Sequence, residues 1–421
     1  MIGNDTLSNV DGFGQYVGDG SDGGNGRDLL IGRDVIELAS SAGVVGDGSA
    51  GNNGHDTLVG NDEIRIGLQG DVVGDGSSGG EGDDSLLGND TIETGIFEGT
   101  AIGDGSAGGS GNDVLVGNDT IVGGAGNDSI VGDGSSGGNG DDTIFGNDSI
   151  LGGGGDDTIV GDAILGGNGN DLVFGEDTIE GGDGNDLIFG DSRSGFPEPG
   201  TEDHSDDSIS GGAGDDELQG QLGSDTLLGG AGNDLLLGSN GADSLLGGAG
   251  NDSLEGAGAG GAGGNDTLDG GDGTDVLAIG TITGDSFRGG DDLDFLNLGR
   301  DVDFGSESQD VSGIEVIDLR ADSFNNSSGP LVVSLDLADV LDFAADATTG
   351  EVFGATAIDL VIRGDADDAV NLAIGSGFAL AGNQALADPI YGGAGIGYDI
   401  YTDGSGQVVA IEDIIATVNT S

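Results

Sequence analysis

A nine-residue repeat constrains the fold of this chain more than any other feature of its sequence. From Gly211 to Glu255 five nonapeptides follow one another without a break, and each fits the pattern G-[GQS]-x-G-x-D-x-L-x. Two further copies begin at Gly261 and Gly270, and a decayed copy begins at Gly289. A short fixed period of this kind is typical of solenoids, in which each repeat contacts only its neighbours.

The first half of the chain uses a longer period that is built from similar parts. A hexapeptide, G-x-D-x-apolar-x, begins at Gly3 and recurs at nearly constant spacing up to its last copy at Gly175. A nonapeptide precedes every hexapeptide after the first, and a second nonapeptide follows the later ones. A five-residue spacer such as GDGSS (132–136) completes the 29-residue unit. Each unit therefore holds three short apolar segments, which predicts one coil of a three-sided solenoid.

Each repeat combines a turn with a very short strand. The cluster of Gly, Asn and Asp favours a tight turn, because glycine adopts positive φ without steric cost. The x-apolar-x segment that follows is predicted to be a strand with its middle residue directed inward, as for Ile144 in GGNGDDTIF. Stacked copies would align these aliphatic side chains into a thin core. The sequence thus predicts an all-β fold, a parallel β-solenoid (β-roll or β-helix) of stacked Gly/Asp-rich repeats.

The last third of the chain has a different pattern, from which we expect a β-rich C-terminal domain. Longer apolar alternations at 314–319, 331–337, 358–364 and 408–415 predict ordinary strands, and 337–344 has the pattern of a short helix. The expected parts are a solenoid of 29-residue period (1–194), a linker or loop with two prolines (195–205), a nonapeptide roll (206–279) and a β-rich cap (280–421).

Charge and composition exclude several classes of function. Asp and Glu number 79 against 8 basic residues, and the net charge of −71 disfavours nucleic acids and anionic membrane surfaces as partners. Cysteine is absent, which removes disulfides and thiolate zinc sites. No stretch approaches the ~20 apolar residues of a membrane-spanning helix, and the first residues lack the pattern of a secretory signal peptide. In a chain this acidic the carboxylates repel one another and oppose folding unless cations neutralise them.

Calcium is the cation that the repeat predicts. In G-G-x-G-x-D the glycines let backbone carbonyls turn toward one point, where the position-6 aspartate adds a carboxylate, and Ca²⁺ prefers oxygen ligands of this kind. Stacking would bring the equivalent turn of the next coil nearby. The candidate ligands are Asp28, Asp56, Asp84, Asp113, Asp128, Asp142, Asp157, Asp171, Asp186, Asp216, Asp225, Asp234, Asp243, Asp252, Asp266 and Asp275. The hexapeptide aspartates, which are either further ligands or turn-forming residues, are Asp34, Asp62, Asp90, Asp119, Asp148 and Asp177.

On these residues the nonapeptides resemble the repeat of RTX proteins, the haemolysin-type calcium-binding repeat, over roughly the first two-thirds of the chain. The resemblance implies a parallel β-roll, Ca²⁺ held by the position-6 aspartate and turn carbonyls, and export by a type I secretion apparatus with an uncleaved C-terminal signal. The segments IEVIDL, LADVL and RGDADDAVNL, and the final YDIYTDGSGQVVAIEDI, look like the C-terminal regions of type I-secreted RTX adhesins. The longer unit of the first half departs from the plain nonapeptide roll.

We therefore expect a non-enzymatic, extracellular or cell-surface protein that folds on Ca²⁺ after export and has a structural or adhesive role. Its expected partners are calcium ions, the type I secretion apparatus and cell-surface or matrix polysaccharide. Two alternatives stay open. One is a secreted RTX hydrolase or polysaccharide epimerase whose repeats are an export module. The other is a solenoid that binds ice or polysaccharide through an outward array of Thr91, Thr120, Thr143, Thr158 and Thr178.

Other motif matches lie inside the repeat and are better explained by it. G-x-G-x-x-G occurs in the spacers without a helical pattern after it, which argues against a dinucleotide site. GSSGG (76–80) matches the nucleophile motif G-x-S-x-G but recurs from Gly134, so we interpret Ser78 as a turn serine. His55 and His204 are too few for a histidine metal cluster, and His55 is expected to be exposed. A turn scaffold without metal is disfavoured, because so many stacked carboxylates would repel one another.

Overall fold

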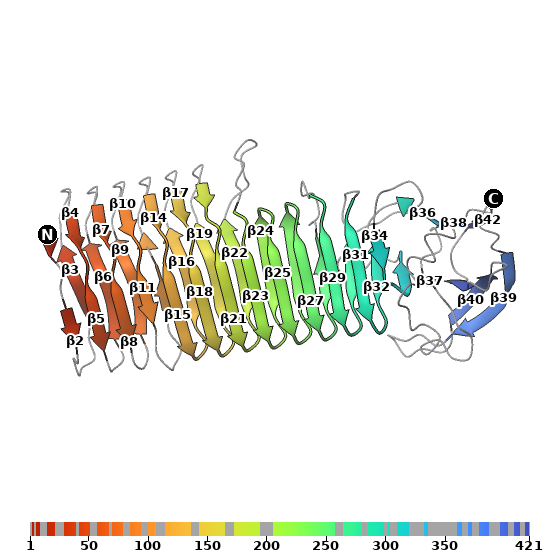
Figure 1. Cartoon of the computed structure of the whole chain (residues 1–421), viewed down its shortest axis with the longest axis horizontal. Coiled ribbons are helices and arrows are strands. Elements are labelled where there is room, and N and C mark those ends of the chain that lie inside the picture. The colour runs from red at the N-terminus through yellow and green to blue at the C-terminus, as the bar shows by residue number, and fades with distance from the viewer. Residues whose placement is uncertain are drawn as a thin grey trace. The chain divides into compact units, whose positions relative to one another are not determined.

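The computed structural model consists of short strands that recur along the chain (Figure 1). It describes residues 2–3, 6–8, 15–21, 29–38, 42–50, 57–66, 70–78, 85–93, 100–103, 105–106, 114–135, 143–164, 172–193, 205–256, 264–279, 284–298, 302–303, 310–319, 332–335, 360–363, 369–372, 379–386, 396–402, 408–412 and 417–420. Within these ranges no residue is helical, and so no helix there could cross a membrane. The chain divides into two compact units, residues 1–227 and residues 228–421.

The first unit contains three rows of parallel strands, here called rows A, B and C. Row A consists of β1 (Ile2–Gly3), β4 (Leu29–Gly32), β7 (Thr57–Gly60), β10 (Ser85–Gly88), β14 (Val114–Gly117), β17 (Thr143–Gly146) and β20 (Leu172–Phe174). Row B consists of β2 (Thr6–Ser8), β5 (Val35–Leu38), β8 (Glu63–Ile66), β11 (Thr91–Glu93), β15 (Thr120–Ala125), β18 (Ser149–Gly154), β21 (Thr178–Asp183) and β23 (Ser208–Ala213). Row C consists of β3 (Gln15–Ser21), β6 (Ala42–Ala50), β9 (Gly70–Ser78), β12 (Thr100–Ile102), β13 (Gly105–Ser106), β16 (Ser129–Ser135), β19 (Thr158–Ile164), β22 (Leu187–Arg193) and β24 (Glu217–Leu222).

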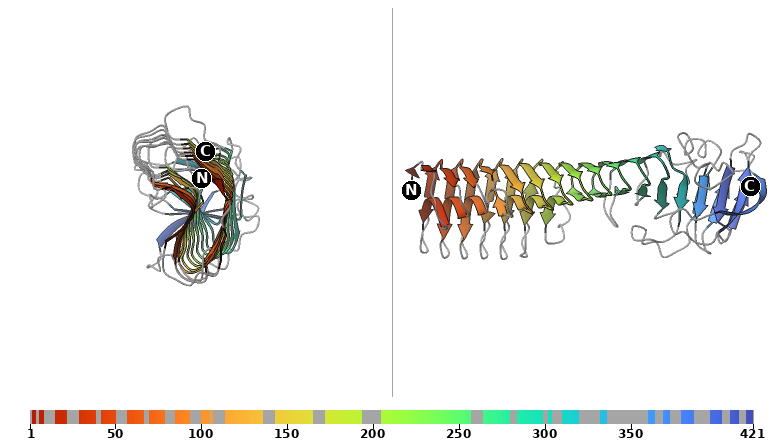
Figure 2. Two further views of the ribbon diagram at one scale, coloured as in Figure 1. Left: turned by 90° about the vertical axis from the view of Figure 1, so that its left-hand side faces the viewer. Right: turned by 90° about the horizontal axis from the view of Figure 1, so that it is seen from below.

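In each row, paired residues of neighbouring strands are one sequence repeat apart. Ser85 in β10 pairs with Thr57 in β7 and with Val114 in β14, which hold the equivalent positions of the preceding and following units. One repeat unit is therefore one coil that adds to each of the three rows, as the three apolar segments predict, and Figure 2 shows these coils following one another from red to yellow. After β20 the coil has only two strands among the described residues, and the sequence separation of equivalent positions in row B shortens, as between Asp207 and Asp225.

The core of the first unit is the thin aliphatic column that the repeat predicts. Where the structure describes the side chain, the middle residue of the x-apolar-x segment is buried, as for Ile144 in row A, Ile150 in row B and Ile159 in row C. Along row A, Leu86, Leu115 and Ile144 pack against one another. The residues on either side of these positions are more exposed, so the burial alternates around them, as in the pattern of β18.

The turn glycines are required by both φ and space. Gly153 and Gly155, at positions 2 and 4 of their nonapeptide, have φ of +116° and +129°, values that side chains with a Cβ rarely adopt. A Cβ on Gly153 would also overlap the carbonyl oxygen of Gly124 in the preceding coil. The glycines therefore allow the coils to approach closely, as well as allowing the chain to turn.

The second unit begins as a stack of two-strand coils. One row consists of β27 (Ser244–Ala249), β29 (Thr267–Asp272), β31 (Ser286–Asp291) and β34 (Asp310–Ser312), and β25 (Thr226–Ala231) spans the boundary of the two units. The other row consists of β26 (Leu235–Asn240), β28 (Ser253–Glu255), β30 (Val276–Ile279), β32 (Phe295–Leu298), β35 (Val316–Asp318), β37 (Leu360–Arg363) and β41 (Val408–Glu412). Both rows are parallel, and Leu236, Leu254 and Leu277 form successive buried positions.

The described residues of the C-terminal third lie mostly in strands, as predicted. β35, β36 (Val332–Leu335), β37 and β41 lie within the four segments that the apolar alternation indicated as strands. β36 belongs to a four-stranded parallel sheet with β33 (Val302–Asp303), β38 (Ala369–Leu372) and β42 (Thr417–Thr420). β39 (Ala379–Leu386) and β40 (Ile396–Thr402) pair antiparallel, and β40 also pairs antiparallel with β41. The predicted helix at 337–344 and the proline-containing segment 196–203 lie outside the described residues.

Candidate metal centres

The turn between rows B and C of the first unit carries a ladder of aspartates, here called the nonapeptide ladder. Its members are the position-6 residues Asp128, Asp157, Asp186 and Asp216. The backbone N–H of each residue donates to Oδ1 of the equivalent aspartate in the next coil at 2.8 Å. The repeat places these residues in line because each is followed, two positions later, by the inward aliphatic residue of the next strand. The aspartate and the aliphatic residue thus face the same side, and the carboxylate points into the coil.

The turn that leads into row B carries a second ladder, here called the hexapeptide ladder; this turn follows row A up to Asp177 and follows row C at Asp225. The ladder runs through Asp34, Asp62, Asp90, Asp119, Asp148, Asp177, Asp207 and Asp225, with N–H···Oδ1 distances of 2.8–2.9 Å. Asp225 is a position-6 residue of a nonapeptide. The hexapeptide aspartates therefore occupy the same place in the coil as a nonapeptide aspartate.

In both ladders Oδ1 accepts a backbone N–H from the preceding coil, as in Asp148 and Asp157. Oδ2 of Asp148, Asp157 and Asp177 is buried and has no hydrogen-bond partner. Glycines make room for it: a Cβ on Gly132 would overlap Asp148 Oδ2, and a Cβ on Gly152 would lie 2.5 Å from Asp157 Oδ2. A buried carboxylate oxygen without a donor is strongly unfavourable unless a cation or a proton compensates it.

Burial raises the pKa of these carboxyls. The pKa of Asp157 rises to about 6 through loss of hydration, opposed by the hydrogen bond from Asp128 and reinforced by the charge of Asp186. For Asp148 burial and the charges of Asp119 and Asp177 raise the pKa to about 8. In the second unit burial likewise raises the pKa of Asp275 to about 7 and that of Asp294 to about 8. The protein thus holds its aspartates where ionisation is costly without a counter-charge.

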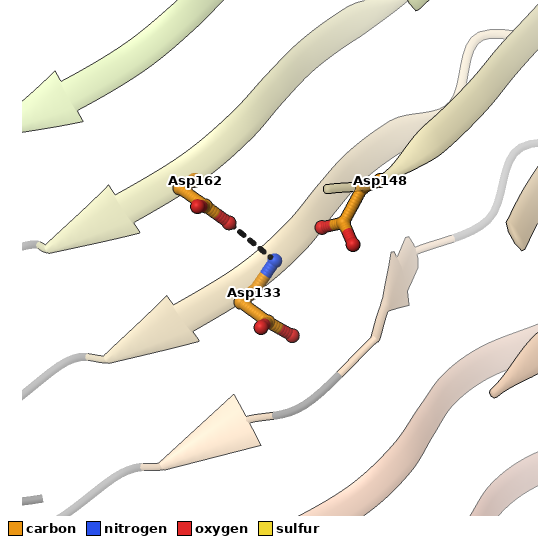
Figure 3. A group of neighbouring side chains, drawn as sticks. All are labelled: Asp133, Asp148 and Asp162. Carbon is orange, nitrogen blue, oxygen red and sulfur yellow. Dashed lines mark hydrogen bonds between the residues drawn. The ribbon is translucent and has the colours of Figure 1, made fainter. Parts of the chain in front are cut away.

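A third set of carboxylates comes from the spacer, which was not among the predicted ligands. Asp133 in β16, Asp162 in β19 and Asp191 in β22 are aligned in row C and buried. One oxygen each of Asp133, Asp148 and Asp162 lie within 4.8 Å of one another, and the same holds for Asp162, Asp177 and Asp191. Figure 3 shows the first group, with the N–H of Asp133 donating to Asp162 Oδ1 at 3.2 Å. The spacer thus continues the strand and adds a buried carboxylate to it.

The second unit has two ladders with the same bonding. Asp234, Asp252, Asp275 and Asp294 form one, and it ends on Glu315, whose Oε2 accepts the N–H of Asp294 at 2.8 Å. Asp243, Asp266 and Asp285 form the other. Four of the carboxylates in the ladders were not among the predicted ligands: Asp207, Asp285, Asp294 and Glu315. The decayed nonapeptide at Gly289 was the signal for Asp294, whereas Glu315 lies outside any repeat.

The position-5 residues form an exposed ladder beside the nonapeptide ladder. Asn127 Oδ1 accepts the N–H of Asp156 at 3.2 Å, and Asp156 Oδ1 accepts the N–H of Asn185 at 2.9 Å. In the second unit Asn251 donates its N–H to Asn233 Oδ1 at 3.0 Å. This ladder explains why Asn or Asp recurs at a position that the repeat pattern left open.

The structure places ten of the sixteen predicted ligands, and all ten are buried: Asp128, Asp157, Asp186, Asp216, Asp225, Asp234, Asp243, Asp252, Asp266 and Asp275. The other six, Asp28, Asp56, Asp84, Asp113, Asp142 and Asp171, lie outside the described residues, as do His55 and His204. Whether these aspartates bind the ion stays a prediction at this point.

Two minor predictions need correction. Ser78 ends strand β9, so it is a strand residue and not a turn serine. The five threonines do not share one face: Thr91, Thr120 and Thr178 begin strands of row B, while Thr143 and Thr158 begin strands of rows A and C. The single outward array that would favour an ice-binding surface is therefore divided over three sheets.

Parallel strands stacked coil upon coil, with buried columns of carboxylates at the turns, define an acidic β-solenoid. Comparison with protein families then names the repeat: residues 116–136, 136–163, 162–177, 174–192, 205–236, 228–259 and 261–278 match the RTX calcium-binding nonapeptide repeat (4 copies). The chain carries RTX calcium-binding nonapeptide repeats, and their ion is Ca²⁺. No curated protein matches the chain.

The described residues fit calcium on three counts. The donor set is made of carboxylate oxygens, which a hard cation prefers. The Oδ2 atoms of Asp157, Asp186 and Asp252 are buried without a hydrogen-bond partner. Glycines leave open the space into which these atoms point, as Gly181 does for Asp186 and Gly247 for Asp252. Bound calcium would supply the positive charge that lets the ladders stay ionised inside the coil.

Proposed function

We propose that this protein is an extracellular structural or adhesive solenoid whose coils fold when Ca²⁺ binds to the position-6 aspartates. The observation that carries the proposal is the unpartnered, buried Oδ2 atom that recurs in coil after coil, as in Asp157, Asp186 and Asp252. In the unfolded chain these carboxylates are hydrated and far apart, so the sites exist only in the folded coil. Binding free energy therefore becomes folding free energy.

The same sites explain why the chain would fold outside the cell. Extracellular calcium sites typically have dissociation constants of about 10⁻⁴ to 10⁻³ M. At cytosolic calcium the net charge of −71 would keep the chain extended, and outside the cell the ion would close the coils. Export by a type I apparatus is part of this proposal, supported by the RTX repeats and by the resemblance of the C-terminal segments. Deletion of residues 390–421 should then retain the protein in the producing cell, and export of the truncated chain would contradict this part.

The experiment that tests the proposal is a calcium titration of the full chain followed by far-ultraviolet circular dichroism at neutral pH. The β-sheet signal should rise cooperatively between about 10⁻⁴ and 10⁻³ M free Ca²⁺. Mg²⁺ is the matched control, and it should substitute poorly because it demands octahedral geometry and sheds water reluctantly. A complete β-sheet spectrum in excess chelator would refute calcium-coupled folding and would leave the repeats as a turn scaffold.

A further inference from the structure

The spacer and hexapeptide aspartates converge inside the three-strand coils, in groups that contain no residue of the nonapeptide ladder. Asp148 lies at the turn between rows A and B, while Asp133 and Asp162 lie in successive strands of row C. When the coil closes, these three residues come together, and one carboxylate oxygen of each lies within 4.8 Å of the other two. The next coil repeats the arrangement with Asp162, Asp177 and Asp191, so that Asp162 belongs to both groups.

Two features of these groups point to a ligand. Asp148, Asp162 and Asp177 are 2%, 0% and 2% exposed, and the Oδ2 atom of each has no hydrogen-bond partner. The glycine at the start of each hexapeptide leaves open the space where the two kinds of carboxylate meet. A Cβ on Gly146 would lie 3.2 Å from Asp133 Oδ2 and 3.4 Å from Asp148 Oδ1. A Cβ on Gly175 would lie 3.0 Å from Asp162 Oδ2 and 3.4 Å from Asp177 Oδ1.

We propose that the spacer and hexapeptide aspartates form a second row of calcium sites, inside the coil and separate from the nonapeptide turns. Three carboxylates at this separation repel one another strongly in a low-dielectric interior, and a divalent cation among them replaces repulsion by attraction. The donors are oxygen only, which selects a hard cation. Ca²⁺ tolerates the irregular arrangement that the strands impose, whereas Mg²⁺ demands a regular octahedron.

The sequence extends this row along the first unit. A spacer aspartate precedes a hexapeptide aspartate at the same spacing in every coil, as in Asp19 and Asp34, Asp47 and Asp62, Asp75 and Asp90, Asp104 and Asp119, Asp133 and Asp148, and Asp162 and Asp177. The backbone register aligns Asp19, Asp47 and Asp75 in row C, just as it aligns Asp133, Asp162 and Asp191. The contiguous nonapeptides from Gly211 to Glu255 have no spacer and should lack these sites.

The test counts calcium bound to the full chain by equilibrium dialysis with radioactive calcium. Asp162→Asn keeps an Oδ1 acceptor for Asp133 but removes a ligand shared by both groups, so it should lose two bound ions. Asp191→Asn touches only the second of the two groups and should lose one. Glu180→Gln makes the same charge change on the exposed face of β21 and should lose none.

The same experiment tests the second row of sites and the nonapeptide sites separately. Asp157→Asn reports on a nonapeptide site, so its result can fail or hold independently of the Asp162→Asn result. Equal calcium counts for the wild type and a folded Asp162→Asn variant would overturn the second row. So would an infrared band of protonated carboxylic acid that persists in excess calcium and weakens in Asp162→Asn, since protons would then compensate the carboxylates. If Asp162→Asn does not fold, the calcium counts of Asp177→Asn and Asp191→Asn test the proposal instead. Each variant should bind one calcium ion fewer than the wild type.

Discussion

A coil in residues 143–164 has three strands, and a coil in residues 235–252 has two. The larger coil buries Ile144, Ile150 and Ile159, together with Asp148, Asp157 and Asp162. The smaller coil buries Leu236 and Leu245, together with Asp243 and Asp252. The ratio of one inward aliphatic residue to one buried carboxylate per strand is the same in both. The unit of construction is therefore the strand with its carboxylate, and adding a third strand adds a third column of charge as well as core.

The pH dependence without calcium should show the largest effect on both kinds of coil. Burial raises the pKa of Asp148 to about 8 and that of Asp157 to about 6 in the larger coils, and that of Asp275 to about 7 in the smaller ones. A raised pKa in the folded state stabilises the fold below the unfolded value of about 4, and this stabilisation is lost as pH rises through the folded values. In chelator the coils should be protected at pH 5 and unprotected at pH 8, as measured by hydrogen exchange with mass spectrometry.

The control for this prediction is the same measurement in saturating calcium. Protons and Ca²⁺ compete for the same oxygens, so the calcium midpoint should rise as pH falls. Loss of amide protection on acidification in chelator would contradict the assignment, because it would mean that ionised carboxylates stabilise the metal-free coil.

Removal of one ladder carboxylate from each kind of coil should have the next largest effect. Asp157→Ala and Asp252→Ala both delete an Oδ1 acceptor and a candidate ligand. Each should raise the calcium midpoint on the order of tenfold, or ~1.4 kcal/mol for the affected site. Asp252→Ala should have the greater effect on its own coil, because a two-strand coil has no spacer column to hold another ion. Hydrogen-exchange rates of residues 143–164 and 235–256, followed as calcium is added, give the calcium midpoint of each coil. Calcium midpoints that are equal in both variants and in the wild type would count against the assignment of these aspartates as ligands.

Glycine positions in the turn should differ sharply in their tolerance of a side chain. Gly153→Ala forces alanine to φ of +116° and drives its Cβ onto the Gly124 carbonyl, so it should destabilise by about 1–3 kcal/mol or more. Gly154→Ala, one residue later, meets nothing nearer than the Asp183 carbonyl oxygen at 4.0 Å, and it should change stability by less than about 0.5 kcal/mol. Chemical denaturation in saturating calcium measures the difference, and similar costs for the two variants would argue against this close packing of coils.

The smallest expected effect is a gain in stability in the second unit. Ser239 stands at position 2 of its nonapeptide with φ of +83°, in a place where other repeats use glycine. Ser239→Gly should relieve this backbone strain and stabilise the protein by roughly 0.5–1 kcal/mol, after the entropy cost of glycine is subtracted. Ser244→Gly, in strand β27, is the matched control and should destabilise by a similar amount. A loss of stability in both variants would show that the backbone at Ser239 is not strained.

The sequence predicts the features that recur at equivalent positions along the stack better than the contacts between residues from different parts of one coil. The period of the first half predicted the strands, the inward direction of Ile144 and the alignment of Asp157 with the equivalent turn of the next coil, because each follows from position within a repeat. The groups around Asp162 were not foreseen, because Asp148 and Asp162 come from different parts of the repeat and meet only when the coil closes. The spacer GDG also has the composition of a turn, although it lies in a strand. Glu315 gave no signal, since it belongs to no repeat.

The direction of the ladder bonds makes the two ends of a stack chemically different. In the buried aspartate ladders the N–H belongs to one coil and the accepting carboxylate to the coil that follows it, as for Asp275 and Asp294, whereas the exposed position-5 ladder runs the other way, as from the Asp156 N–H to Asn127. A stack that stopped at Asp294 would expose a row of unmet donors, and such an open edge is a template on which another chain can polymerise head to tail. Glu315 reaches back to accept the Asp294 N–H, and β35 pairs with β32 beside it. That glutamate therefore satisfies the last N–H of this carboxylate ladder inside the fold, while β37 and β41 continue the row of strands beyond β35, so this ladder presents no open donor to a second chain.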